Sequence, residues 1–197
     1  MTTSFAGKKI VIIGLGLIGG SLARSLKTTE PQTRIFAVGR NAPVLQQAMM
    51  DGSIDGWSNS ALELCIDADL VVLGMPVLAI EQNLGDLANV LTSQTVVTDV
   101  ASVKGAVVDA AIRVFGTVPP NFVLGHPIAG SEQSGYAASK ADLYHGRKVI
   151  LTPLPHTNPQ AVKMVADLWS TAGAEVVSMS VEHHDEVLAA TSHLPHL

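Results

Sequence analysis

Short apolar runs alternate along the chain with stretches in which apolar residues recur every three or four positions. The apolar runs, rich in Val and Ile, predict strands at residues 8–14, 34–39, 68–76, 95–100, 121–127, 147–153 and 174–180. The periodic stretches predict helices at residues 18–28, 43–51, 78–91, 104–115, 159–172 and from 182 onward. Strands that alternate with helices in this way predict an α/β fold.

The runs in the first half of the chain are apolar at nearly every position, so both faces of those strands should be buried. Strands of this kind are typical of parallel sheets that carry helices on both faces. The fold class that we predict is therefore α/β, with a doubly wound, mostly parallel sheet of the Rossmann type.

The first strand leads into the sequence IVIIGLGLIGGSLARSL at residues 10–26, in which Gly14, Gly16 and Gly19 have the spacing G-x-G-x-x-G. This spacing between a strand and a helix is typical of a dinucleotide-binding turn. The glycines argue against a secretion signal. Polar residues also interrupt the run well before the roughly 20 apolar residues that a membrane span needs.

Each glycine has a role in the predicted turn. Gly14 permits the tight turn, Gly16 leaves no Cβ in the way of a pyrophosphate, and Gly19 lets the helix pack closely on the strand. The backbone N–H groups at the helix start would then face the phosphates. We expect the dinucleotide to contact Gly14, Leu15, Gly16, Leu17, Ile18 and Gly19. The alternative is that the glycines serve only a tight turn.

The residues after the second strand indicate which dinucleotide would bind. NAD-binding sites usually place an acidic residue there, to hold the ribose 2′-hydroxyl. Here Gly39, Arg40 and Asn41 stand at that place. A guanidinium pairs with a 2′-phosphate, so we expect NADP to be preferred over NAD; the alternative is an ordinary solvated arginine. Met75 and Pro76 end the strand predicted at 68–76 and should contact the cofactor from the same edge.

Composition and charge exclude several classes of function. The chain is 47% hydrophobic and 15% charged, with a net charge of −5, which is typical of a soluble globular protein. Its 12 Lys and Arg residues are scattered, so we expect no nucleic-acid partner, and we expect no membrane association either. The single cysteine, Cys65, fits a reducing compartment, and we predict a cytoplasmic location.

Two further strand ends carry side chains suited to chemistry. Ser102, in TDVASVKG, either caps the helix that begins near Lys104 or places its hydroxyl beside the nicotinamide or the substrate. His126, in GHPIAG, should lie at the same crevice. A histidine that titrates near neutrality can take a proton from a substrate hydroxyl as hydride departs. The alternative is a histidine that is hydrogen-bonded into a loop.

Together, the segments GLGLIGGSLARSL, TDVASVKG, GHPIAGSEQSG, KVILTP and SHLPHL closely resemble the prephenate and arogenate dehydrogenases of tyrosine biosynthesis. The resemblance runs in order from about residue 8 to residue 197, and GHPIAG and SHLPH distinguish this family from other dinucleotide-binding enzymes. It implies oxidative decarboxylation of prephenate to 4-hydroxyphenylpyruvate, or of arogenate to tyrosine, with transfer of hydride to a nicotinamide.

The resemblance also implies the roles of particular residues. His126 would be the catalytic residue that accepts the proton of the ring hydroxyl. Ser102 would hydrogen-bond the same hydroxyl and help to place the cofactor, and His193 would be a further catalytic residue on the substrate side. The substrate-binding residues implied in this way are Ser131, Glu132, His193 and His196.

By the same resemblance, residues 1–180 form the dinucleotide-binding domain and residues 181–197 begin a helix that leads toward a helical domain absent from this chain. In the family, that domain carries the homodimer interface and an arginine for the substrate carboxylate. We therefore expect a small-molecule substrate, a homodimer formed through the further domain, and incomplete catalysis by this chain alone.

Three other interpretations remain. The chain could be a dehydrogenase of the wider hydroxyacid type, although no lysine follows residue 172 to serve as that type requires. It could be a module that binds NADP(H) without turnover. A metal site of His183, His184, His193 and His196 would lack a spaced cysteine or a His-Glu motif, so we predict none. We expect His183 and His184 to flank the start of a solvated helix instead.

Overall fold

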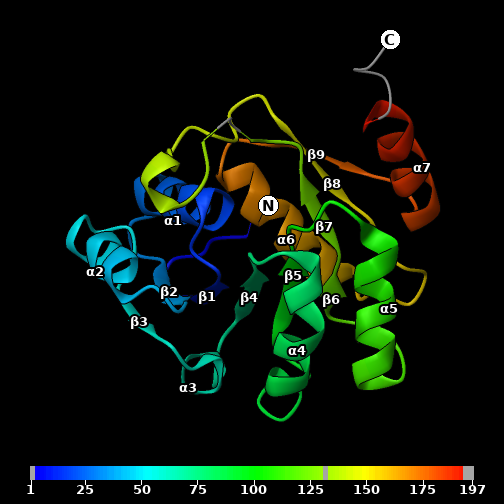
Figure 1. The fold of residues 1–197 in the computed structure, drawn as a ribbon, viewed down its shortest axis with the longest axis horizontal. Coiled ribbons are helices and arrows are strands. Elements are labelled where there is room, and N and C mark those ends of the chain that lie inside the picture. Colours follow the sequence, from blue (N-terminus) through cyan, green and yellow to red (C-terminus); the bar gives the residue numbers. More distant parts are fainter. Residues whose placement is uncertain (1–2, 131–132, 193–197) are drawn as a thin grey trace.

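The computed structural model describes residues 3–130 and 133–192, which form two β-sheets with helices packed around them (Figure 1). The larger sheet has six parallel strands in the order β3-β2-β1-β4-β5-β6. Its strands are β1 (Lys9–Ile13), β2 (Arg34–Val38), β3 (Gly56–Ser58), β4 (Leu70–Leu73), β5 (Val96–Asp99) and β6 (Phe122–Val123). This is the strand order of a Rossmann fold, so the predicted fold class is confirmed.

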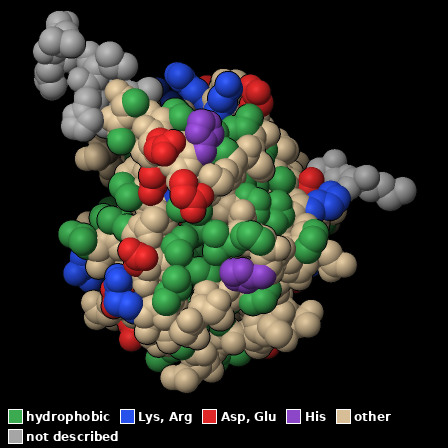
Figure 2. All heavy atoms as spheres, turned by 90° about the vertical axis from the view of Figure 1, so that its right-hand side faces the viewer, with side chains coloured by type: hydrophobic (Ala, Val, Ile, Leu, Met, Phe, Trp, Pro, Cys, Tyr) green, Lys and Arg blue, Asp and Glu red, His purple; other side chains and the backbone are tan. Residues whose placement is uncertain are grey.

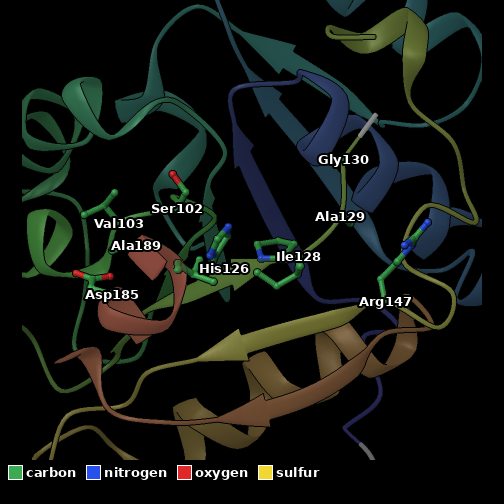
Figure 3. Close-up of a pocket in the computed structure, with 11 residues that line it drawn as sticks. Ser102, Val103, His126, Ile128, Ala129, Gly130, Arg147, Asp185 and Ala189 are labelled. Atoms are coloured by element: carbon green, nitrogen blue, oxygen red, sulfur yellow. The ribbon is translucent and has the colours of Figure 1, made fainter. Parts of the chain in front are cut away.

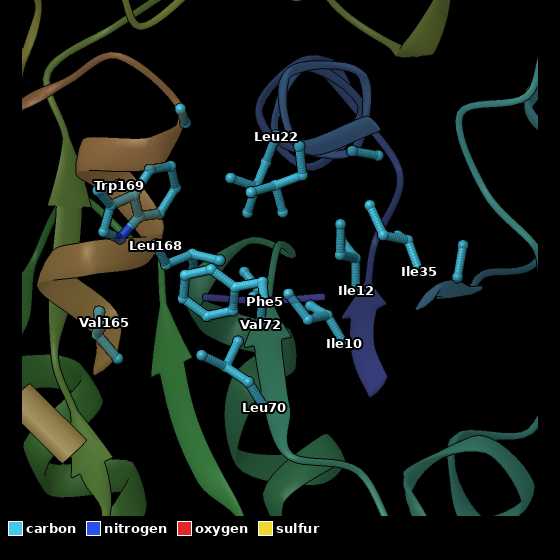
Figure 4. Close-up of a cluster of buried hydrophobic side chains, with 14 of the residues drawn as sticks. Phe5, Ile10, Ile12, Leu22, Ile35, Leu70, Val72, Val165, Leu168 and Trp169 are labelled. Carbon is cyan, nitrogen blue, oxygen red and sulfur yellow. The ribbon is translucent and has the colours of Figure 1, made fainter. Parts of the chain in front are cut away.

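Helices cover both faces of the larger sheet. One face packs against α1 (Leu17–Thr29), α2 (Ala42–Met50) and α6 (Pro159–Thr171), and the other against α3 (Ala61–Cys65), α4 (Val77–Leu87) and α5 (Lys104–Phe115). Ile10 and Ile12 of β1 belong to the first core, which Figure 4 shows, whereas Val11 and Ile13 belong to the second. Because successive side chains of a strand point to opposite faces, two buried faces require the unbroken apolar runs seen in the sequence.

The smaller sheet consists of β7 (Gly125–Pro127), β8 (Lys148–Leu151) and β9 (Glu175–Ser178). β7 is antiparallel to β8, and β8 is parallel to β9. The strand predicted at 121–127 therefore divides between two sheets at Leu124, whose carbonyl accepts a hydrogen bond from the N–H of Thr152 at 3.0 Å. The later apolar runs thus build a second sheet beside the larger one.

The sequence did not predict three short elements, β3, α3 and the 3-10 helix η1 (Tyr136–Ala138). The η1 helix lies in a segment that runs from the smaller sheet over α1. Within this segment, the Tyr144 hydroxyl donates a hydrogen bond to the Ile18 carbonyl at 2.6 Å. A Cβ at Gly20 of α1 would lie only 2.7 Å from the Tyr136 ring. The segment therefore packs closely against the helix that follows the glycine turn.

The last helix, α7 (Val181–Ser192), packs against α5 on one side of the molecule (Figure 1). Hydrophobic side chains gather in the middle of that side (Figure 2). Ile112 of α5 and Val187 of α7 are both exposed. Within residues 3–130 and 133–192, no helix combines the length and the apolar character needed to cross a membrane.

Candidate functional site

The carboxyl ends of β1, β2 and β4 border a cavity of about 680 Å³. The chain leaves β1 and β4 toward opposite edges of the sheet, and doubly wound proteins bind ligands at such a switch point. The predicted cofactor residues that line this cavity are Gly14, Leu15, Gly16, Gly39, Arg40, Asn41, Met75 and Pro76. Leu17, Ile18 and Gly19 form the start of α1, beside the cavity rather than in its wall.

The glycine turn has the geometry of a phosphate cradle. Gly14 has a φ of +98°, in the left-handed region that favours glycine, and a Cβ there would lie 2.7 Å from the Gly74 carbonyl oxygen. A Cβ at Gly19 would lie 2.5 Å from the Gly14 carbonyl oxygen, so only glycine lets α1 approach β1 this closely. Around Gly16, in contrast, a Cβ would meet no heavy atom within 4 Å. Gly16 is also the N-cap of α1 without a capping side chain, so the turn fits a pyrophosphate.

Arg40 is the charged side chain at the carboxyl end of β2, and it is exposed. Its neighbour Asn41 caps α2, because the Asn41 Oδ1 accepts a hydrogen bond from the N–H of Val44 at 3.4 Å. Two nearby acidic residues point elsewhere. Asp55 accepts a hydrogen bond from the N–H of Ile35 at the start of β2, and Asp51 accepts one from the hydroxyl of Tyr136.

A second cavity, of about 800 Å³, lies where α5, α7 and the smaller sheet meet (Figure 3). It brings together Ser102 and His126, which the sequence predicted from separate segments. The other residues that line it are Val103, Pro127, Ile128, Ala129, Gly130, Arg147, Asp185, Leu188 and Ala189. Ser131, Glu132, His193 and His196 lie outside the described residues, so their roles stay predictions.

Ser102 does not cap α5. The N-cap residue is Val103, and the backbone N–H groups of Lys104 and Gly105 instead donate to the carboxylate of Asp185 in α7, at 3.0 and 2.9 Å. The capping alternative for Ser102 is therefore wrong, and its side chain lies in the wall of the cavity. Sequence reasoning missed Asp185, because 80 residues separate it from the Gly105 that it caps.

His126 belongs to a row of three side chains. Its Nδ1 lies 3.0 Å from the Nε2 of His184, and the Nδ1 of His184 lies 2.7 Å from the Oδ1 of Asp185. His184 is fully buried, so the expectation that it flanks a solvated helix is wrong, whereas His183 is exposed. The reason is that the helical period of α7 turns His184 inward against β7. Among the residues that the structure describes, no group of three or more His, Cys, Asp or Glu side chains could hold a metal ion.

A buried ion pair lies next to this row. The Nζ of Lys104 donates hydrogen bonds to the Oδ2 of Asp99 and to the carbonyl of Gly125, each at 2.5 Å, and both charged side chains are fully buried. Burial lowers the pKa of Lys104, and the neighbouring Asp99 opposes this effect without cancelling it. The pair ties the end of β5 to the start of β7, the strand that carries His126.

The environment of His126 lowers its pKa from 6.5 to about 4. Burial is the largest cause, and the charge of Lys104 and the neighbouring His184 act in the same direction, while Asp185 opposes them. The expectation that this histidine titrates near neutrality is therefore wrong. The ring is neutral at physiological pH, which is the form that a proton acceptor needs.

Arg147, just before β8, is a cation in the same cavity that the sequence analysis missed. In the register of the smaller sheet, His126 pairs with Ile150. Only this antiparallel pairing brings the start of β8 to the cavity, and nothing in the sequence near RKVILTP signals it.

Comparisons with known proteins agree with this geometry. A family model described as "Prephenate dehydrogenase, nucleotide-binding domain" matches residues 22–178. A cyclohexadienyl dehydrogenase of Zymomonas mobilis is 38% identical over 192 residues, which cover 96% of this chain and 64% of that protein. The chain thus spans less than two thirds of the length of this curated relative.

Two solved structures resemble the chain over almost its whole length. Prephenate dehydrogenase from A. aeolicus, in complex with hydroxyphenyl propionate and NAD+, has a TM-score of 0.88 and 35% identity, and the match covers 98% of this chain and 67% of that one. Synechocystis arogenate dehydrogenase has a TM-score of 0.86 and 29% identity, with 95% and 65% covered.

Proposed function

We infer the function of this chain from its family, because the chain belongs to the nucleotide-binding domain family of the prephenate dehydrogenases. The chain provides the dinucleotide site and the catalytic histidine of such an enzyme. The reaction is the oxidative decarboxylation of prephenate or arogenate in the biosynthesis of tyrosine. The observation that carries this proposal is the cavity that His126 shares with Ser102.

The dinucleotide binds in the cavity at the carboxyl ends of β1, β2 and β4. The glycine turn would hold its pyrophosphate, because Gly16 leaves open space and Leu17 and Ile18 offer N–H groups of the first helical turn. Gly39, Arg40 and Asn41 would border the adenosine ribose, and Met75 and Pro76 line the same cavity. The A. aeolicus relative contains NAD+, which supports a nicotinamide dinucleotide as the cofactor of this chain.

The preferred dinucleotide is NADP rather than NAD. Arg40 is exposed at the carboxyl end of β2, where a guanidinium forms charge-assisted hydrogen bonds to a 2′-phosphate. Asp51 and Asp55, the first two acidic residues after Arg40 in the sequence, are engaged with Tyr136 and with the start of β2.

His126 acts as the general base. A nicotinamide dinucleotide held in the first cavity would supply the hydride acceptor. As hydride leaves C4 of the substrate ring, the C4 hydroxyl becomes a carbonyl and His126 takes the hydroxyl proton. Ser102 hydrogen-bonds the same hydroxyl and orients it. The C–C bond to the ring carboxylate then breaks, carbon dioxide leaves, and the electron pair makes the ring aromatic. The former carbonyl oxygen takes the proton back and becomes the phenol of the product.

The remaining predicted residues complete the substrate side. Ser131, Glu132, His193 and His196, to which the family resemblance assigns this place, bind the substrate, and His193 also takes part in catalysis. The full-length protein is a cytoplasmic homodimer. Light scattering on the purified full-length protein tests the dimer, which a monomeric mass would contradict.

The test is the rate of dinucleotide reduction by the full-length protein with prephenate, with arogenate and with a simple 2-hydroxy acid, each product being identified. The proposal predicts turnover of prephenate or arogenate and release of carbon dioxide. Turnover of the hydroxy acid alone would indicate a dehydrogenase of the wider hydroxyacid type. Dinucleotide binding without turnover of any of the three would indicate a binding module.

A further inference from the structure

The row His126–His184–Asp185 connects the cavity with the start of α5. His184 lies between the other two side chains and is fully buried, so both of its ring nitrogens have protein partners and no access to water. Each partner lies within ordinary hydrogen-bond distance, at 3.0 Å for His126 and 2.7 Å for Asp185. The protons on these rings are therefore determined by their partners.

Asp185 determines which atoms donate and which accept in the hydrogen bonds of this row. Partial burial raises the pKa of its carboxyl, but hydrogen bonds from the N–H groups of Lys104 and Gly105 and from His184 outweigh this effect and keep the pKa below its usual range. An ionised carboxylate only accepts hydrogen bonds. The Nδ1 of His184 must therefore carry the proton and donate it to Asp185.

The remaining protons follow in sequence. The ring of His184 is fully buried, and burial favours the uncharged form of an imidazole. An uncharged ring with N–H at Nδ1 has a lone pair at Nε2, so the Nε2 of His184 accepts a hydrogen bond. Its partner is the Nδ1 of His126, which must then carry a proton. In neutral His126 this leaves Nε2 without a proton.

We propose that His184 and Asp185 are positioning residues that hold His126 in the tautomer with N–H at Nδ1, so that its bare Nε2 is the atom that accepts the substrate proton. The role as proton acceptor rests on the function proposed above, whereas the tautomer itself does not. When Nε2 takes the proton, the charge formed on His126 is stabilised through His184 by the carboxylate of Asp185.

The surrounding charges keep His126 in its neutral form, on which the argument depends. Lys104 and His184 disfavour a second proton on the ring, and Asp185, which favours it, is one ring further away. Asp99 is paired with Lys104 on the other side. Three groups therefore act on His126, namely Lys104 on α5 and His184 and Asp185 on α7.

Nitrogen NMR of the chain labelled at its 7 histidines tests the tautomer directly. A His126→Gln variant identifies the His126 signals by their loss. We expect a protonated Nδ1 and an unprotonated Nε2 at His126 in the unmodified protein at pH 7. A proton at Nε2 of His126 there would overturn the proposal, whether or not the full-length protein turns over any substrate.

Two variants test what holds the tautomer. His184→Phe removes the Nε2 that accepts the hydrogen bond from His126. In Asp185→Asn the side-chain amide can donate as well as accept, so it no longer fixes the proton on the Nδ1 of His184. Both variants should therefore shift His126 toward the Nε2–H form. His183→Phe and Glu186→Gln, exposed neighbours on α7, are the matched controls and should leave the tautomer unchanged. If His184→Phe fails to fold, the tautomer of His126 measured in Asp185→Asn and in the unmodified protein still tests the proposal. An unchanged tautomer in folded Asp185→Asn would contradict the role of Asp185.

The kinetic consequence is measured in the full-length protein with the substrate that it turns over. Asp185→Asn should lower kcat by about tenfold or more, as loss of the required tautomer does in other histidine bases, with dinucleotide affinity and KM little changed. A loss of affinity with unchanged kcat would show a role in folding the cavity rather than in orienting the ring.

Discussion

Arg40 is the residue on which the choice of dinucleotide depends. A charge-assisted hydrogen bond contributes about 1.5–3 kcal/mol, so one or two such bonds to a 2′-phosphate discriminate by roughly tenfold to several hundredfold. Solvent screening at this exposed site favours the lower figure. We predict that the unmodified chain binds NADP more tightly than NAD in calorimetry and that Arg40→Asp reverses the order. Arg34→Asp, at the opposite end of β2, is the control for the charge change and should keep the preference. Tighter binding of NAD by the unmodified chain would refute the assignment.

His126 couples the site to the pH dependence of stability. Its pKa is about 4 in the folded protein against 6.5 in the unfolded chain, so between these values the unfolded chain binds more protons. The folded state is therefore favoured above pH 6.5 and loses this advantage as the pH falls toward 4. We predict that the free energy of unfolding falls more steeply over this window in the unmodified chain than in His126→Gln. Parallel curves from denaturant titrations at several pH values would show that the pKa is not lowered.

At the scale of an element, the glycine turn offers two substitutions that distinguish an effect on stability from an effect on dinucleotide affinity. Gly16→Ala adds a methyl group into open space, so we predict unchanged thermal stability and a large loss of dinucleotide affinity. Gly14→Ala meets both a φ of +98° and the Gly74 carbonyl, so it should also lower stability, by about 1–3 kcal/mol. Gly85→Ala, in α4 with nothing within 4 Å of the added Cβ, is the control for both readouts. Normal affinity in Gly16→Ala would place the pyrophosphate elsewhere.

The sequence predicted the helices and strands that have a clear hydrophobic periodicity. It did not predict the features that depend on contacts with residues distant in the sequence. The unbroken apolar run of β1 and the 3.6-residue period of α1 need only local information. The division of the 121–127 strand needs Thr152 and Asp99, which lie in other segments. The burial of His184 follows from the packing of α7 on α5, and its polar neighbours in VEHHDEV favour a solvated helix instead.

In the molecule as a whole, the two cavities are lined by different parts of the chain. Every residue that lines the dinucleotide cavity lies between Ile13 and Asp86, whereas the His126 cavity is lined by residues from Ser102 to Ala189. We therefore predict that the 197-residue chain by itself binds dinucleotide, as calorimetry would show. Absence of binding by the folded chain would mean that the cavity between β1 and β4 is not the cofactor site.

The account depends most on His126, which it makes the general base of the reaction. The direct measurement compares full-length unmodified protein with His126→Asn, in both dinucleotide affinity and turnover of prephenate or arogenate. His183→Asn, at an exposed histidine of α7, is the matched control and should behave as the unmodified protein. We predict unchanged dinucleotide affinity and a turnover lowered by on the order of a hundredfold or more in His126→Asn. Unchanged turnover in that variant would contradict the account.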